Sequence, residues 1–83
     1  MRIYHFGDSR NVIGKLVKEL RLEKHLSQKA LAEKRQLMGY EVSDLTILRI
    51  ENGTRFVPDY EVVGLCKALE VSPAYLLGMD SER

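Results

Sequence analysis

Residues 27–55 read SQKALAEKRQLMGYEVSDLTILRIENGTR, and this stretch decides the fold. Ser27 is a favourable N-cap residue, and the Ala- and Leu-rich segment after it predicts a first helix. Ser43 or Asp44 then caps a second helix, which ends before Gly53. Two short helices joined in this way can present the second one to a groove of DNA. The stretch therefore predicts a helix-turn-helix and, with it, a binding protein.

Another helix is expected before this pair, with Asp8 or Ser9 as its N-cap. Its inner face is formed by apolar residues at helical spacing: Ile13, Leu16, Val17 and Leu20. Residues 1–10 alternate only weakly between apolar and polar side chains. They are expected to form an N-terminal arm or a short strand.

Two helices are expected after the pair. The first runs from about Tyr60 to Leu69, and the second is a short helix over residues 74–77 that begins after Ser72-Pro73. The apolar face of the longer one is expected to hold Val62, Val63, Cys66 and Leu69. Because the sequence contains no alternating strand pairs, we expect an all-α domain, a compact bundle of five short helices.

The chain has the size and composition of one small globular domain. It has 83 residues, of which 45% are hydrophobic and 30% are charged. Cys66 is the only cysteine, so no internal disulfide can form and a reducing compartment is expected. The first residues lack the apolar core of a signal peptide, and no apolar run approaches the roughly 20 residues of a membrane span. We therefore expect a cytoplasmic protein with no membrane segment.

The net charge of +1 hides an uneven distribution along the chain. Residues 1–35 hold nine Lys or Arg and four Asp or Glu, a balance of +5, whereas residues 36–83 hold four and eight, a balance of −4. A basic half suits contacts with phosphates, and an acidic half limits indiscriminate attachment to DNA. Segregation of charge by chance in so short a chain is the alternative.

The sequence offers no site for chemistry. The two histidines, the one cysteine and the scattered carboxylates show neither metal-ligand spacing nor a nucleophile beside a base. The glycines form no phosphate-binding loop. We therefore expect no enzyme, no metal and no cofactor.

An ordered set of short segments runs along most of the chain. The segments are Ile13-Gly14, Leu20-Arg21, Leu26-Ser27-Gln28, Leu31-Ala32, Arg49-Ile50-Glu51-Asn52-Gly53, Ala68-Leu69-Glu70-Val71-Ser72 and Leu76-Leu77. This set resembles the lambda-repressor-like family of helix-turn-helix proteins, which includes the Cro/repressor and xenobiotic-response-element groups. The resemblance covers about residues 11–78 and leaves residues 79–83 as a C-terminal tail. It implies a five-helix bundle that binds double-stranded DNA sequence-specifically, usually as a dimer, and that regulates transcription.

One departure from this family concerns the turn of the motif. Between Ala32 and Glu51 the chain has about six residues more than the usual spacing. We therefore expect either a longer first helix in the motif or a loop packed by Met38, Tyr40 and Val42.

Contacts with DNA are expected from the two helices of the motif and from the loop after them. Arg49 is the expected guanine contact, with a phosphate contact or a surface ion pair as the alternatives. Leu45 and Leu48 can meet thymine methyl groups or pack beneath the enlarged turn, and we favour packing for Leu45 and groove contact for Leu48. The resemblance gives Gln28 a phosphate or base contact. The full set is Gln28, Lys29, Ser43, Asp44, Leu45, Thr46, Leu48, Arg49, Asn52, Thr54 and Arg55.

The resemblance also implies an ion pair between Arg21 and Glu51 that ties the first helix to the third. A single module buries little DNA surface, so a homodimer on two half-sites is expected. One candidate for the dimer surface is the last helix and tail, with Tyr75, Leu76 and Met79. The other is the N-terminal arm, with Ile3, Tyr4 and Phe6. Ordinary packing in the core is the alternative for the apolar residues of both.

The rival interpretation is a protein-interaction module on the same fold, such as an antitoxin or a co-regulator that binds a protein partner. Exposure of Leu45, Leu48 and Tyr40 as one patch would favour that rival. A single basic edge would favour DNA, and its residues would be Gln28, Arg49, Asn52 and Arg55.

Overall fold

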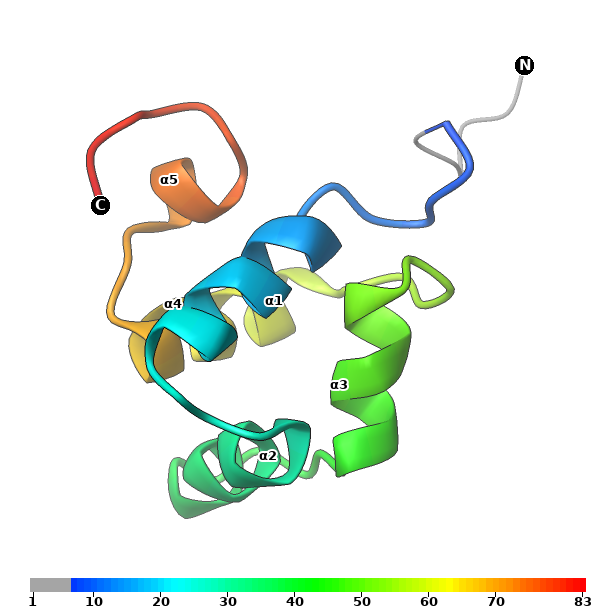
Figure 1. Cartoon of the computed structure of the whole chain (residues 1–83), viewed down its shortest axis with the longest axis vertical. Helices are drawn as coiled ribbons and strands as arrows, with labels where there is room; N and C mark the ends of the chain where they lie inside the picture. The colour runs from blue at the N-terminus through cyan, green and yellow to red at the C-terminus, as the bar shows by residue number, and fades with distance from the viewer. Residues whose placement is uncertain (1–6) are drawn as a thin grey trace.

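The computed structural model describes residues 7–83, and these residues form the five expected helices (Figure 1). The helices are α1 (Gly14–Glu23), α2 (Gln28–Leu37), α3 (Asp44–Glu51), α4 (Asp59–Leu69) and α5 (Pro73–Leu76). The part of the chain that the structure describes contains no β-strand, so the all-α prediction is confirmed. The dimer contacts suggested for Ile3, Tyr4 and Phe6 lie outside the described residues.

Serine side chains cap three of these helices. Ser27, Ser43 and Ser72 precede α2, α3 and α5, and each hydroxyl accepts a hydrogen bond from the backbone N–H three residues on, over 2.9, 3.3 and 3.1 Å. Each bond satisfies one of the amides that a helix N-terminus leaves without a partner. The predicted serine caps of these three helices are therefore confirmed, although α5 spans Pro73–Leu76 and not residues 74–77.

The predicted cap of the first helix, Asp8 or Ser9, is wrong. α1 begins at Gly14, whose N–H donates to Oδ1 of Asn11 over 2.8 Å. The Asn11 amide also donates to the carbonyl of Ile50 over 3.1 Å, at the end of α3. Because Asn11 binds the end of α3 and the N–H of Arg10 donates to the carbonyl of Gly53 over 2.8 Å, the residues before α1 are held at the end of α3 and do not extend α1.

One apolar core lies between the helices. Val63 was expected in it but is 42% exposed, because α4 turns the side containing Glu61 and Gly64 inward. The core residues are Ile13, Val17, Leu20, Leu31, Ala32, Val42, Ile47, Ile50, Leu65, Cys66, Ala68, Leu69, Val71 and Leu76.

Residues 38–43 connect α2 to α3 as a loop, and the loop alternative for the enlarged turn is therefore correct. Gly39 follows the end of α2 with a φ of +92°, a left-handed conformation that glycine adopts without strain. Val42 is 7% exposed and packs into the core, and Tyr40 is half-buried against it. Met38, which was expected to pack the loop as well, is 40% exposed.

Candidate nucleic-acid interface

α3 lies along one edge of the molecule (Figure 1), and its buried and exposed residues form two distinct faces. Ile47 and Ile50 are 0% exposed and fix its inner face in the core. The opposite face carries exposed side chains at helical spacing, which we call the α3 stripe: Asp44, Leu45, Leu48, Arg49 and Asn52. Residues at these spacings point to the same side of a helix, so the stripe is one continuous surface.

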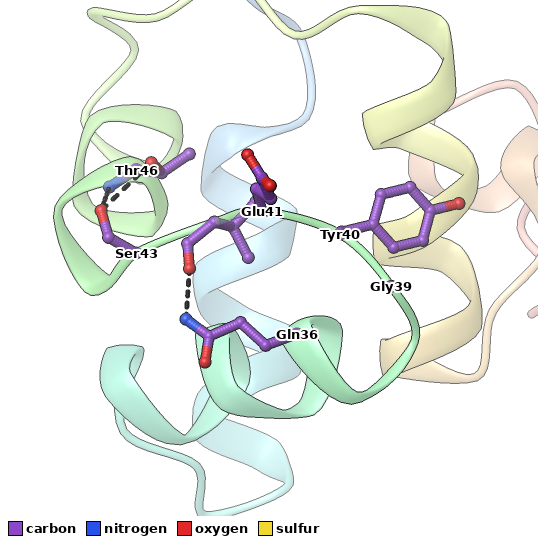
Figure 2. A pocket seen from close by; sticks show the side chains of 7 residues that line it. Gln36, Gly39, Tyr40, Glu41, Ser43 and Thr46 are labelled. Carbon is purple, nitrogen blue, oxygen red and sulfur yellow. Dashed lines mark hydrogen bonds between the residues drawn. The ribbon is translucent and has the colours of Figure 1, made fainter.

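The two leucines of the α3 stripe are both exposed, Leu45 by 47% and Leu48 by 41%. The expectation that Leu45 packs beneath the enlarged turn is therefore wrong. Tyr40, which would have joined them in a protein-binding patch, lies elsewhere. Its ring points toward α4 (Figure 2), where it stacks on the guanidinium of Arg35.

An open hollow of about 600 Å³ lies between the end of α2 and the start of α3 (Figure 2). Hydrogen bonds brace its walls, since Nε2 of Gln36 donates to the carbonyl of Val42 over 2.5 Å and the hydroxyls of Ser43 and Thr46 lie 3.3 Å apart. These bonds hold the enlarged loop, so that α3 begins at a fixed position despite the extra residues. The hollow is lined by Gln36, Gly39, Tyr40, Glu41, Val42, Ser43 and Thr46.

The residues at the end of α3 divide into one free side chain and several bonded ones. Arg49 is exposed and has no ion-pair partner within residues 7–83. Oδ1 of Asn52 accepts hydrogen bonds from the hydroxyl and the N–H of Thr54, over 2.7 and 3.1 Å. Arg55 is bound to Glu61, with Nη2 2.7 Å from Oε2. Of the basic residues here, Arg49 is therefore the one that is ready to contact a ligand.

Arg21 and Glu51 form the ion pair that the resemblance implied. Nε and Nη2 of Arg21 donate to the two carboxylate oxygens over 2.6 and 3.0 Å, and Nη1 donates to the carbonyl of Leu26 over 2.8 Å. The hydrogen bond to Glu51 raises the pKa of Arg21 above its ordinary value. Gln28 joins this group, because its Nε2 donates to Oε1 of Glu51 over 3.2 Å. Lys29, the next residue, is exposed.

Two buried charged residues were not found in the sequence as functional candidates. Arg35 is 0% exposed at the end of α2, and Glu61 is 5% exposed in α4. The sequence does contain a signal for the arginine, since it follows Leu31 and Ala32 at the spacing that places a side chain on the inner face of a helix. Such a charge at a core position requires a specific environment.

We searched the described part of the chain for metal sites and for membrane-spanning helices. Within residues 7–83, no group of three or more His, Cys, Asp or Glu side chains could hold a metal ion. No helix in this range is long and apolar enough to cross a membrane. The buried thiol of Cys66 has a pKa above its ordinary value because burial disfavours the thiolate.

Comparisons with known proteins agree with this geometry. Residues 17–76 match the helix-turn-helix family model. Among solved structures, the chain is similar to the P22 c2 repressor protein in complex with a synthetic operator, at 27% identity and a TM-score of 0.71. The similarity covers 84% of this chain and 98% of that one. No curated protein matches the chain.

Proposed function

The chain belongs to the helix-turn-helix family, and on that premise we propose that it binds double-stranded DNA through α3 and regulates transcription as a repressor. The observation that carries the proposal is the α3 stripe, which is exposed while Ile47 and Ile50 hold the opposite face of α3 in the core. The similar P22 c2 repressor was solved with a synthetic operator, which supports the same class of ligand. The family and this neighbour also agree with a binding protein and not with an enzyme.

The α3 stripe contains side chains that can distinguish base pairs in a major groove. Arg49 can donate two hydrogen bonds to guanine, and Asp44 can accept one from the amino group of cytosine. Leu45 and Leu48 offer apolar surface to thymine methyl groups. A bidentate arginine–guanine contact is worth roughly 1–3 kcal/mol of discrimination, so Arg49 is the principal reader.

Phosphate contacts are proposed on both sides of the stripe. The α2 N-terminus presents backbone N–H groups, with Gln28 held in place by Glu51 and with exposed Lys29 beside it. On the other side, Thr54 and Arg55 follow α3, and Ser43 and Thr46 lie at its start. Contacts of this kind orient the protein on the duplex without reading its sequence.

A homodimer on two half-sites remains part of the proposal. The expected contact through Leu76 is wrong, because this side chain is 1% exposed in the core. Tyr75 is half-buried and lies 5.6 Å beneath the guanidinium of Arg83, which also binds Glu23 of α1 over 2.8 Å. Met79, at 80% exposure, is the candidate left on this side. A cytoplasmic location likewise stays a prediction.

One alternative function is supported by the exposure of Leu45 and Leu48, namely binding of a protein partner that covers this apolar surface. Tyr40 does not join the pair, because its ring is directed toward α4 and stacks on the guanidinium of Arg35. The apolar surface on the stripe is then limited to Leu45 and Leu48, with the exposed charges of Asp44 and Arg49 beside them, which supports DNA over a protein partner.

Selection of bound duplexes from a random DNA pool tests the proposal. The native protein should enrich a two-fold symmetric sequence, and Arg49→Ala should lose preference at a guanine position while it retains general affinity. Gln28→Ala should weaken binding with the base preference unchanged. Lys67→Ala is the control, since it removes an exposed charge from α4, away from the stripe. No enrichment at low salt would contradict the proposal and favour the protein partner.

A further inference from the structure

The end of α2 buries an arginine whose guanidinium has no hydrogen-bond partner among residues 7–83. Arg35 is 0% exposed, and its Nε, Nη1 and Nη2 atoms are all enclosed. The carbon of the guanidinium lies 4.7 Å from the centroid of the Tyr40 ring, so a cation–π contact offsets part of the cost of burial. A buried charge still requires a counter-charge, because the protein interior solvates ions poorly.

The acidic residue that acts electrostatically on Arg35 is Glu61, on α4. The guanidinium of Arg35 lies against Gly64 of the same helix, where an added Cβ would be 2.6 Å from Nη2. Glu61 precedes Gly64 by three residues, and residues at this spacing are neighbours on a helix surface. Burial lowers the pKa of Arg35, and the Glu61 carboxylate acts on it in the opposite direction. The two charges therefore interact across the interface between α2 and α4.

The carboxylate is nevertheless hydrogen-bonded to a different arginine. Nη2 of Arg55 donates to Oε2 of Glu61 over 2.7 Å, and Nε approaches Oε1 at 3.4 Å. The Arg55 side chain is 36% exposed, at the protein surface beyond α3. Two guanidinium groups thus share one buried carboxylate, and the outer one holds both hydrogen bonds.

We propose that Arg35 and Arg55 exchange on Glu61: when a DNA phosphate draws Arg55 outward, the carboxylate turns to Arg35. The proposal rests on the DNA-binding function proposed above. Loss of one member of a buried ion pair ordinarily strands the other charge, which opposes such a movement. Arg35 removes this opposition, because its guanidinium is buried against α4 and its five N–H donors are not used by other residues of the described chain.

Arg35 is in this view a positioning residue. It is fully buried and cannot touch DNA, yet it makes Arg55 available for a phosphate contact. A purely structural arginine would affect stability alone. An exchanging arginine also affects the number of phosphates that the protein neutralises, which the salt dependence of binding measures.

The first test measures binding to a fluorescein-labelled duplex of mixed sequence at several NaCl concentrations. Arg55→Gln should make the slope of log K against log [NaCl] shallower by about 0.9, the value of one phosphate contact. Arg35→Met should reduce the slope equally, because Glu61 then retains Arg55. The double variant Arg35→Met/Glu61→Gln should recover the native slope, since no carboxylate holds Arg55. Lys67→Met, which removes an exposed α4 charge, should leave the slope unchanged.

The exchange would be overturned if Arg35→Met had the same salt-dependence slope as the native protein, or if the double variant did not recover that slope. The DNA-binding function would stand in either case. A native slope in Arg55→Gln would overturn the exchange as well, since Arg55 would then bind no phosphate. Absence of duplex binding by the native protein at low salt would reject the proposed function and the exchange with it.

A second measurement needs no variant that could fail to fold. In ¹⁵N-labelled native protein, the arginine Nε–H resonances report the hydrogen bonds of each guanidinium. Addition of the duplex should move the Arg55 signal and shift the Arg35 signal downfield, with slower exchange with water, because Arg35 gains a carboxylate partner. An Arg35 signal that does not change while α3 responds to the duplex would contradict the exchange.

Discussion

Two buried arginines lie at opposite ends of α2, and their surroundings differ. Arg21 reaches the start of α2 from α1 and donates three hydrogen bonds, two to Glu51 and one to a backbone carbonyl. The guanidinium of Arg35, at the end of α2, contacts the Tyr40 ring at 4.7 Å and has no hydrogen-bond partner among residues 7–83. The three hydrogen bonds of Arg21 form a closed network that fixes the start of α2. At the end of α2, the guanidinium of Arg35 keeps N–H donors that can bind a carboxylate in a second arrangement. The comparison suggests a motif that is rigid at one end and adjustable at the other.

Breaking the closed network should have the largest effect. Arg21→Ala leaves the buried Glu51 carboxylate without its ion-pair partner, so the free energy of unfolding should fall by about 3–5 kcal/mol. Urea denaturation followed by circular dichroism measures this change. Lys18→Ala, an exposed residue of the same helix, is the control and should stay within about 0.5 kcal/mol of the native protein. An unchanged melting temperature in Arg21→Ala would show that the network does not stabilise the fold.

Filling the space beside the second arginine should have an intermediate effect. A Cβ in Gly64→Ala would lie 2.6 Å from Nη2 of Arg35 and 2.9 Å from Cζ of Tyr40. Alanine in a helix gains about 1 kcal/mol over glycine, but overpacking of an enclosed site costs roughly 1–3 kcal/mol. Because the arginine is fully buried and cannot swing into solvent, we expect net destabilisation in thermal melts. A higher melting temperature would mean that this site is looser than its geometry indicates.

Removing the aromatic ring should have the smallest effect of the three. Tyr40→Leu keeps apolar volume but loses the cation–π contact, which is worth about 1 kcal/mol for a half-buried ring. Tyr40→Phe keeps the ring and is the matched control, with a change of less than about 0.5 kcal/mol expected in urea denaturation. Equal losses in the two variants would assign the stabilisation to the hydroxyl and not to the ring.

Of the two ends of α2, the start could be predicted from the sequence. Ser27 and Ser43 precede their helices as caps, and cap bonds are local, so sequence spacing is enough to predict them. The pairing of Arg21 with Glu51 is not local, and it came from the family resemblance and not from the pattern of residues.

The surroundings of Arg35, at the end of α2, could not be predicted in the same way. The burial of the Arg35 side chain depends on three residues: Gly64, which is 29 positions later, Tyr40 in the enlarged loop and Glu61 of α4. None of these partners shares a local pattern with it. The start of α1 was predicted wrongly for the same reason, because Asn11 binds a carbonyl of α3, 39 residues away in the sequence.

The most direct test of the proposed function follows the backbone amide resonances of ¹⁵N-labelled protein during titration with the duplex selected from the random pool. DNA binding through α3 predicts that the largest changes occur along the α3 stripe and at the start of α2. Changes concentrated on α4 and α5, with the α3 resonances unmoved, would contradict α3 as the reading helix.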